Sequence, residues 1–298
     1  MWRSSTVSTA EKIPVLLRAH ARTMDLSLRL LPRALRQPLG LAYLLARASD
    51  TIADSGSMPR EERIAWFERM HAALAAEQIE TLFPEKIPEA LSPAERELID
   101  SLPVLFALLK ECSDREELVA LWREILEGQL FDLRRFAPGS APLDHAELER
   151  YCDLVAGSVG RCWTRLIARH APDTLLTPPH ELLPLASDYG KGLQLLNILR
   201  DREADHAIGR HYVVAAAVPR QLELTREWLA AGKRYLHSLA SGRILMATAL
   251  PLDLAMATLP LIAPAPEGTR AKLTRSAVRK TLAAGVRSLV LPRRPDPV

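Results

Sequence analysis

The sequence predicts an all-α protein folded as a single helical bundle. Helical periodicity dominates every patterned stretch, and no alternating strand pattern competes with it. The proline-containing stretches 83–92, 137–142 and 171–179 are short enough to be loops rather than domain linkers. We therefore expect one domain over residues 1–298 with a frayed tail at 292–298. The periodic segments, in chain order, are 59–77, 93–111, 114–134, 145–169, 181–206 and 220–241.

The most apolar stretch, residues 244–263, is expected to be a buried helix. Pro251, Asp253 and Pro260 interrupt it, so it lacks the roughly 20 uninterrupted apolar residues of a membrane span. Residues 2–12 are polar and mixed, unlike a secretory leader, so export is not expected.

Composition points to a soluble globular protein. Hydrophobic residues make up 48% and charged residues 25% of the chain, which are ordinary globular values. With 39 basic and 36 acidic residues, the charge is too balanced for a dedicated nucleic-acid binder. Cys112, Cys152 and Cys162 show neither CxxC nor zinc-like spacing, so a reducing cytoplasm is the expected location.

A polar stripe runs along the otherwise apolar segment LGLAYLLARASDTIAD. Tyr43, Arg47, Asp50 and Asp54 stand at offsets 0, +4, +7 and +11, so they share one helix face.

The segment YGKGLQLLNILRDREAD carries a second stripe. Its members again step by four or three residues, and leucine and isoleucine fill the flanks. They are Gly190, Gln194, Asn197, Asp201 and Asp205.

Two aspartate pairs on apolar helices indicate a bound cation. A single DxxxD spacing usually marks a solvated helix face, but an isolated buried carboxylate costs several kcal/mol. Magnesium prefers oxygen ligands and is commonly held by a few carboxylates together with substrate phosphates. The stripes therefore predict a magnesium–diphosphate clamp.

Four blocks together resemble the squalene and phytoene synthase family of head-to-head prenyl synthases, over roughly residues 15–285. The blocks are HARTMDLSLRLLP, LAYLLARASDTIAD, YCDLVAGSVG and GLQLLNILRDREADHAIGRHY. DTIAD and NILRDREAD resemble squalene synthases more than typical phytoene synthases. The resemblance implies a bundle of the isoprenoid synthase type with a central active-site cavity.

The same resemblance implies roles for individual residues. The implied magnesium ligands, of which the aspartates also serve catalysis, are Asp50, Asp54, Asn197, Asp201 and Asp205. The implied substrate-binding residues are Arg22, Tyr43, Arg47, Gln194, Asn197, Arg200 and Arg210. Tyr151 matches the tyrosine that the family is thought to use in proton removal. For the arginines a surface or capping role stays open, as does a plain core role for Tyr151.

Two further interpretations concern pairs of neighbouring residues. Gly157 and Gly160 are expected to be packing residues that let their helix approach a neighbour closely. His206 and His211 are not expected to form a metal site, because a five-residue spacing places them off one helix face.

The activity implied by the resemblance is that of a squalene synthase. It would couple two farnesyl diphosphates through presqualene diphosphate to squalene, with magnesium and NADPH, and so supply a hopanoid, sterol or carotenoid precursor. The alternatives are a presqualene diphosphate synthase, a dehydrosqualene or phytoene synthase that needs no NADPH, and a non-catalytic assembly factor. A substrate of 15 or 20 carbons is equally compatible with the motifs.

Two of these implications rest on weak local signals. The dinucleotide-binding motif GxGxxG is absent, so NADPH use rests on the resemblance alone. The basic segment 272–280 falls where squalene synthases carry a basic stretch near the cofactor, but it also suits a solvated helix face. Arg287, Arg293 and Arg294 suggest peripheral contact with the inner face of an anionic membrane, by a protein that is otherwise cytoplasmic.

Overall fold

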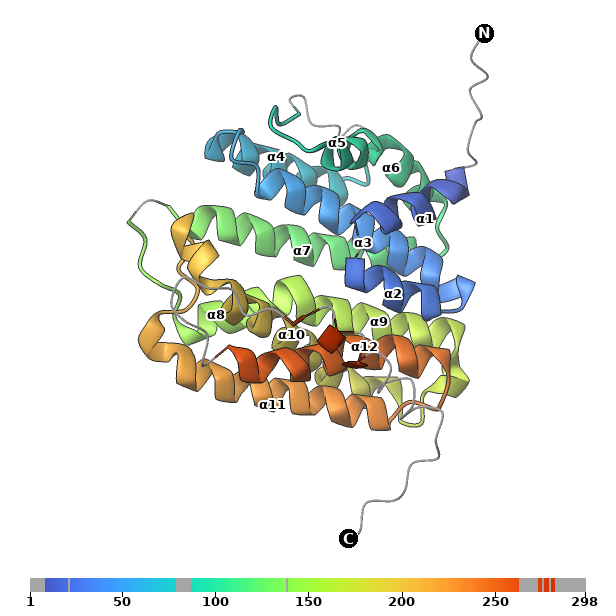
Figure 1. Cartoon of the computed structure of the whole chain (residues 1–298). Coiled ribbons are helices and arrows are strands. Elements are labelled where there is room, and N and C mark those ends of the chain that lie inside the picture. Colours follow the sequence, from blue (N-terminus) through green and yellow to red (C-terminus); the bar gives the residue numbers. More distant parts are fainter. Residues whose placement is uncertain are drawn as a thin grey trace. The chain divides into compact units, whose positions relative to one another are not determined.

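The computed structural model describes residues 9–20, 22–78, 87–137 and 139–262, together with 273–274, 276–278 and 280–281. This described part is built from helices (Figure 1), and its one extended pairing is an isolated bridge between Leu175 and Leu239. The predicted all-α fold class is confirmed.

The helices belong to two compact units. The first runs to Leu28 and resumes over Arg33–Arg134, and the second holds Arg29–Pro32 and the chain from Arg135 onward. Arg243 explains the assignment of the short segment, because its guanidinium Nε donates to the Leu30 carbonyl at 2.8 Å. The single isoprenoid-synthase domain over residues 1–298, and its central cavity, stay predictions.

The helix bounds follow the periodic segments closely. The first unit contains α1 (Thr9–His20), α2 (Arg22–Leu30), α3 (Arg33–Ala53), α4 (Arg60–Ala75), α5 (Pro93–Asp100), α6 (Leu102–Glu111) and α7 (Arg115–Arg135). Only the last residues of α2, Arg29 and Leu30, and of α7, Arg135, belong to the second unit. The second contains α8 (His145–Cys152), a π-helical turn (Asp153–Gly157), α9 (Ser158–His170), α10 (Pro179–Ala207), α11 (Val218–His237) and α12 (Arg243–Thr258).

The segment 93–111 is two helices rather than the one that its periodicity predicts. The break falls at Ser101, two residues before Pro103, which has no N–H and whose ring would clash with the preceding turn of a continuous helix. α5 begins with a capping box in which Ser92 and Glu95 satisfy each other's free N–H groups.

The long helix α3 is the core of the first unit and contacts α1, α5 and α6. Its apolar face is fully covered, since Leu44, Leu45, Ala48 and Ile52 have no exposed surface. A helix buried on this side can present only its opposite stripe to a ligand.

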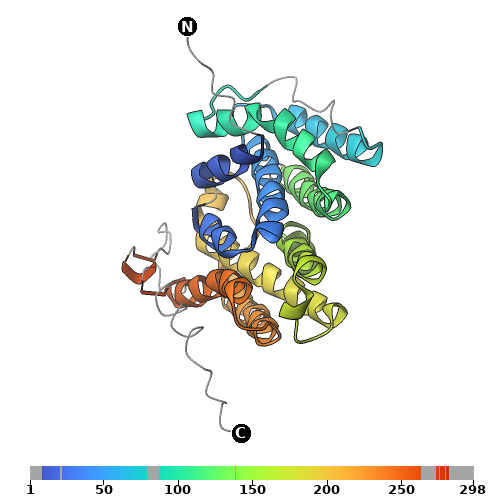
Figure 2. The ribbon, with the colours of Figure 1, turned by 90° about the vertical axis from the view of Figure 1, so that its right-hand side faces the viewer.

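The second unit is organised around α10, which packs on α9 and α11, while α11 and α12 run side by side (Figures 1 and 2). A buried lysine ties three of its helices together. The Lys191 ammonium on α10 lies 2.8 Å from Glu149 on α8 and 3.0 Å from Asp188, and 4.6 Å from the ring centre of Trp228 on α11. Burial opposes the charge of Lys191, but these two carboxylates outweigh it and raise its pKa.

The π-helical turn and α9 lie against α10 with almost no side chain between the backbones. A Cβ on Gly160 would stand 2.0 Å from the Ala186 carbonyl oxygen, and one on Gly190 would stand 2.1 Å from that of Ala156. Only glycine fits at such distances. A Cβ on Gly157 would instead meet side-chain atoms, with Asp153 Oδ1 at 2.2 Å and Ser187 Oγ at 2.7 Å. The packing role predicted for the glycines of this helix is confirmed.

Helix α12 and the short turn after it, Arg243–Leu261, are long and apolar enough to cross a membrane by length and composition. Just over half of the most apolar window, 56%, is buried inside the protein, as in a core helix. Thr248 accepts hydrogen bonds from Tyr189 at its carbonyl (2.9 Å) and from Trp163 at its hydroxyl (3.1 Å). The buried helix predicted for residues 244–263 is therefore present over Arg243–Leu261.

Gly160→Ala and Gly190→Ala should each lower the free energy of unfolding by about 2–3 kcal/mol, because the new methyl group must push two helix backbones apart. Urea titration followed by circular dichroism measures the change. Gly56→Ala is the control, since its added methyl would meet nothing within 4 Å. A wild-type midpoint for either of the first two variants would contradict the backbone contact.

Asp253 lies half-buried on the apolar helix α12, and burial raises its pKa. Because the folded-state pKa exceeds the unfolded value, stability is lost as the pH rises through the raised pKa. Asp253→Asn should therefore stabilise the protein at neutral pH by roughly 0.5 kcal/mol, a small value because half-exposed charges are screened. The gain should become very small near pH 3, below the ordinary aspartate pKa of about 3.9, because the carboxyl is then mostly protonated in both states. Thermal unfolding at both pH values checks this, with exposed Glu227→Gln as the control that should show no such difference.

Candidate active site

The first aspartate stripe lies on α3 in the first unit. Tyr43, Arg47 and Asp50 are half-buried, and Asp54 is exposed in the turn directly after the helix. The Asp54 N–H donates to the Asp50 carbonyl at 2.9 Å, which extends the helical hydrogen bonding to the second aspartate. The Tyr43 hydroxyl donates to the carbonyl of His20 at the end of α1 at 3.0 Å. This bond fixes the tyrosine at the start of the stripe.

Arg47 bridges two carboxylates of the first unit. Its guanidinium donates to Asp50 Oδ2 at 2.5 Å, and its other terminal nitrogen lies 3.9 Å from Glu95 Oε1 on α5. Hydrogen bonds from the side chain and backbone of Ser92, with a smaller contribution from Arg47, hold the pKa of Glu95 below its usual value. Burial, followed by the Arg47 charge, lowers the pKa of His20. The stripe therefore combines a fixed positive charge with carboxylates.

The second stripe lies on α10 in the second unit. Asp201 binds Arg200 as a fork, with Nε at 3.1 Å from Oδ1 and a terminal nitrogen at 2.7 Å from Oδ2. The carboxylate of Asp201 is more enclosed than that of Asp50, with 23% against 40% of the side chain exposed. In the described structure the half-buried amides of Gln194 and Asn197 bond no protein group, which leaves their oxygens available to a ligand.

The turn after α10 closes the end of the second stripe. The Arg210 N–H donates to the Asp205 carbonyl at 2.8 Å, and Gly209 takes the left-handed conformation (φ 83°) that this reversal needs. The same turn brings the rings of His206 and His211 to 4.7 Å between centroids. The two histidines meet although they share no helix face, because the chain reverses between them.

Tyr151 lies in the last turn of α8, directly before the π-helical turn. A capping box of Asp144 and Glu147 begins α8, and Arg135 binds Glu147 through two nitrogens at 2.8 and 3.0 Å. The hydrogen bond from Arg135, followed by that from the Asp144 backbone, lowers the pKa of Glu147. The Tyr151 ring stacks on Tyr212, with centroids 5.1 Å apart and planes inclined by 28°.

The structure places the predicted residues in two groups, one in each unit. Arg22 begins α2, but its side chain lies outside the described residues, as do Arg287, Arg293, Arg294 and most of the basic segment 272–280. The catalytic, metal and substrate roles of all the predicted residues stay predictions.

Tyr212 and Glu95 were not identified from the sequence as site residues. Tyr212 belongs to the quoted block that ends in GRHY, and an aromatic residue two positions after a predicted substrate-binding arginine was the available signal. Glu95 was recognisable as part of the capping box in SPAE, but its approach to Arg47 depends on the packing of α5 against α3.

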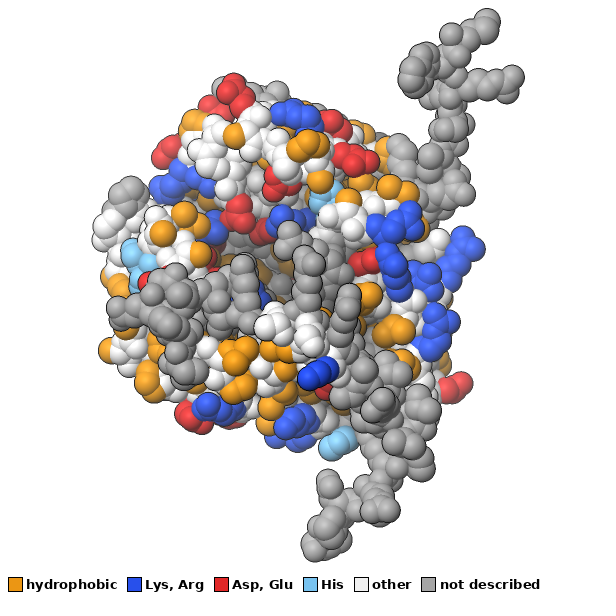
Figure 3. Space-filling model, in the orientation of Figure 1, with side chains coloured by type: hydrophobic (Ala, Val, Ile, Leu, Met, Phe, Trp, Pro, Cys, Tyr) orange, Lys and Arg blue, Asp and Glu red, His pale blue; other side chains and the backbone are white. Residues whose placement is uncertain are grey.

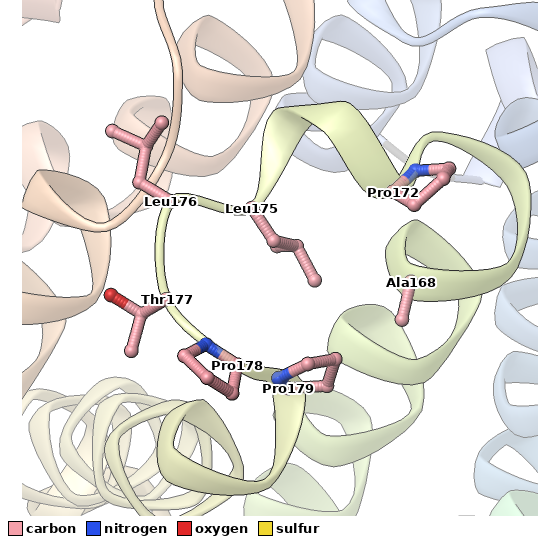
Figure 4. Close-up of a pocket in the computed structure, with 7 residues that line it drawn as sticks. All are labelled: Ala168, Pro172, Leu175, Leu176, Thr177, Pro178 and Pro179. Atoms are coloured by element: carbon pink, nitrogen blue, oxygen red, sulfur yellow. The ribbon is translucent and has the colours of Figure 1, made fainter.

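A pocket of about 300 Å³ in the second unit lies away from these residues. It is formed where α9 ends and α10 begins, and the Leu175 side chain points into it (Figure 4). Its lining is almost wholly apolar, and no predicted site residue contributes to it. Its lining residues are Ala168, Pro172, Leu175, Leu176, Thr177, Pro178 and Pro179. The pocket offers no charged group that could bind a diphosphate.

The donor set of the stripes suits magnesium. Within the described ranges no three His, Cys, Asp or Glu side chains converge into a preformed metal site. Magnesium does not need one, since it retains waters and usually takes one or two protein carboxylates with substrate phosphates. Each stripe supplies two carboxylates about one helical turn apart, and the α10 stripe adds free amide oxygens.

The face of the molecule in Figure 3 carries charges of both signs. Acidic and basic side chains are interspersed over its upper part, and basic side chains gather at its right-hand edge, around α1 and α2. Positive charge near the stripes comes instead from individual arginines that already pair with carboxylates, as Arg47 does with Asp50.

Comparison with known proteins gives matches of sequence and of fold. Presqualene diphosphate synthase of Rhodopseudomonas palustris is 33% identical over 187 residues, which are 63% of this chain and 56% of that protein. A bifunctional lycopene cyclase/phytoene synthase of Pyrenophora tritici-repentis is 30% identical over 200 residues, 66% of this chain and 33% of that protein. The chain thus spans little more than half of the first relative and a third of the second.

The fold is that of a solved structure, TcSQS in complex with the ligand E5700. It has a TM-score of 0.78 at 20% identity and covers 95% of this chain and 89% of that one. The family model described as squalene/phytoene synthase matches residues 17–215, which include both stripes and Tyr151. The chain therefore belongs to the squalene/phytoene synthase family.

Proposed function

We propose that the protein couples two molecules of farnesyl diphosphate head to head and forms presqualene diphosphate. The observation that carries this proposal is the repetition of one motif, an aspartate paired with an arginine on a half-buried helical stripe, once in each unit. The sequence similarity to presqualene diphosphate synthase supports the product. Two diphosphates must be held for such a coupling, and the chain carries two stripes of the required chemistry.

The stripes hold the diphosphates and promote loss of the leaving group. Asp50 and Asp54 in the first unit, and Asn197, Asp201 and Asp205 in the second, would hold magnesium, which when bound would neutralise phosphate charge and make diphosphate a better leaving group. Arg47 and Arg200 are forked donors whose planar geometry matches phosphate oxygens. Each exchanges its carboxylate partner for a phosphate when substrate binds. This places positive charge where negative charge develops, which is an effective form of electrostatic catalysis.

Tyr151 acts on the carbon skeleton. The C–O bond of one farnesyl unit breaks and leaves an allylic cation, which the 2,3-double bond of the second unit attacks. Loss of one proton then closes the cyclopropane ring of presqualene diphosphate. The stacking of the Tyr151 ring on Tyr212 supports this role, because aromatic side chains around a reacting carbon help to keep out water that would quench a cation.

Reduction of presqualene diphosphate to squalene with NADPH is the second candidate. The resemblance of DTIAD and NILRDREAD to squalene synthases favours it. NADPH binding stays a prediction, since most of the basic segment 272–280 lies outside the described residues.

The product assay uses the purified protein with farnesyl diphosphate and magnesium, with and without NADPH. We expect presqualene diphosphate in both reactions, because the coupling step needs no reductant. Mass spectrometry of the extracted lipids identifies the product, and a parallel reaction with geranylgeranyl diphosphate tests the 20-carbon substrate.

Squalene formed only with NADPH would establish the second candidate instead. Dehydrosqualene or phytoene without reductant would contradict both candidates. Absence of any coupled product in the presence of magnesium would contradict the assignment of the stripes as a prenyl-coupling site.

Asp50→Asn and Asp201→Asn should each lower kcat by about 10²–10³-fold, the usual cost of removing one electrostatic group from an active site. Both should also weaken magnesium-dependent binding of inorganic pyrophosphate, measured by isothermal titration calorimetry. The reason is that an amide supplies neither the charge nor the oxygen pair that the hard cation prefers.

The matched controls carry a carboxylate away from each stripe. Glu61→Gln lies on α4 at an exposed position, and Glu203→Gln lies on α10 between the two aspartates but off their face. Both controls should keep wild-type turnover. If Asp50→Asn or Asp201→Asn also kept it, the stripes would have no part in ionisation.

A further inference from the structure

We infer that Tyr212 is a positioning residue for Tyr151, which it holds through ring stacking and a hydroxyl contact. This inference rests on the proposed function, in which Tyr151 accepts the proton. Tyr212 lies outside both stripes and was not predicted as a site residue.

The contact between the two tyrosines has two components. Their rings are stacked at 5.1 Å, and the Tyr212 hydroxyl donates to the Tyr151 oxygen at 3.3 Å. That distance is long for an O–H···O bond. Ring stacking therefore contributes more to the position of the Tyr151 ring, and the hydroxyl contact sets the direction of the Tyr151 O–H bond. Contacts of this kind often tighten only when substrate binds.

Tyr212 itself is held firmly. It is 5% exposed, and the edge of Phe136 meets its ring at 4.8 Å and 76°. The neighbouring His211 carbonyl accepts a hydrogen bond from the Leu143 N–H at 3.1 Å. A residue buried among such contacts can serve as a rigid support for a less buried partner.

The chain also links Tyr212 to the second aspartate stripe. Asp205 begins a reversal that Gly209 permits and the Arg210 N–H closes, and Tyr212 follows two residues later. Gly190, at the other end of the same stripe, abuts the Ala156 carbonyl of the π-helical turn after Tyr151. The stripe and Tyr151 are therefore connected at two points inside one unit.

The hydroxyl contact gives a reason for the direction of proton transfer. One lone pair of the Tyr151 oxygen accepts from Tyr212, so the Tyr151 proton must point elsewhere. Tyr151 can then take the substrate proton on its remaining lone pair while it passes its own proton to the released diphosphate. The tyrosine is neutral before and after, and the proton lost from carbon ends on diphosphate.

The test separates the ring of Tyr212 from its hydroxyl. Tyr212→Phe keeps the stack and should lower kcat by about 5- to 10-fold, the usual effect of one hydrogen bond, with KM unchanged. Tyr212→Leu removes the stack as well and should lower kcat further, to about 50-fold or more below wild type. Tyr151→Phe combined with Tyr212→Phe should be no slower than Tyr151→Phe alone, because the two residues act as one unit.

Tyr189→Phe is the matched control. It removes a buried hydroxyl of the same core whose hydrogen bond goes to the Thr248 carbonyl and not to Tyr151, so it reports loss of stability alone. It should keep wild-type kcat. Wild-type kcat for Tyr212→Phe and Tyr212→Leu, or additive losses with Tyr151→Phe, would overturn the positioning role while leaving the proposed function intact.

A second readout does not depend on turnover. In protein labelled with ¹³Cζ-tyrosine, Tyr212→Phe should shift the Tyr151 resonance, and Tyr189→Phe should not. An unshifted resonance would overturn the contact. If the wild-type protein forms no coupled product, the proposed function fails and the catalytic role of the pair fails with it, whereas a shifted resonance would still establish the contact.

Discussion

The contact of two helix backbones in the second unit is the constraint on which the arrangement of its functional groups depends. Gly160 and Gly190 bring the π-containing helix and α10 together at distances that no side chain permits. Because the contact involves backbone atoms, it determines the register of the two helices rather than only their separation. Tyr151 stands at one end of the first helix and the Gln194–Asp205 side of α10 runs from the same contact. A π-helical turn at this point is consistent with such a role, since π-turns are frequent at functional sites.

A second feature is found in both units: one aspartate of each stripe is already paired with an arginine. Asp50 is paired with Arg47 and Asp201 with Arg200, each within one turn of helix. A half-buried carboxylate would otherwise be costly, and removing one partner of such a pair leaves an uncompensated charge. The same pairing makes the site ready for substrate, because a magnesium–diphosphate complex offers a cation to each aspartate and an anion to each arginine. The protein thus keeps its charges balanced with and without the ligand.

The sequence was sufficient to predict features that follow from local periodicity. The all-α class, the buried helix α12, the two stripes and the packing role of Gly157 and Gly160 all depend on spacing along one helix. Features made by contacts between distant segments could not be predicted in this way. Tyr212 meets Tyr151 only because the chain reverses at Gly209, and His206 meets His211 for the same reason.

Breaks within a periodic segment were also beyond prediction from periodicity. The segment 93–111 divides at Ser101 because Pro103 fits the first turn of α6 but disfavours one continuous helix, whereas Pro251 lies inside α12 without ending it. The division of the described chain into two compact units likewise reflects long-range contacts, which the spacing of residues along the sequence does not predict.

A crystal structure with magnesium and a non-cleavable thio-analogue of farnesyl diphosphate tests the central claim most directly. The account predicts metal density at the carboxylates of both stripes, with the Arg47 and Arg200 guanidinium groups turned from Asp50 and Asp201 to phosphate oxygens. Tyr151 should remain stacked on Tyr212. Diphosphate bound away from either stripe, or aspartates still paired to their arginines in the ligand-bound protein, would contradict it.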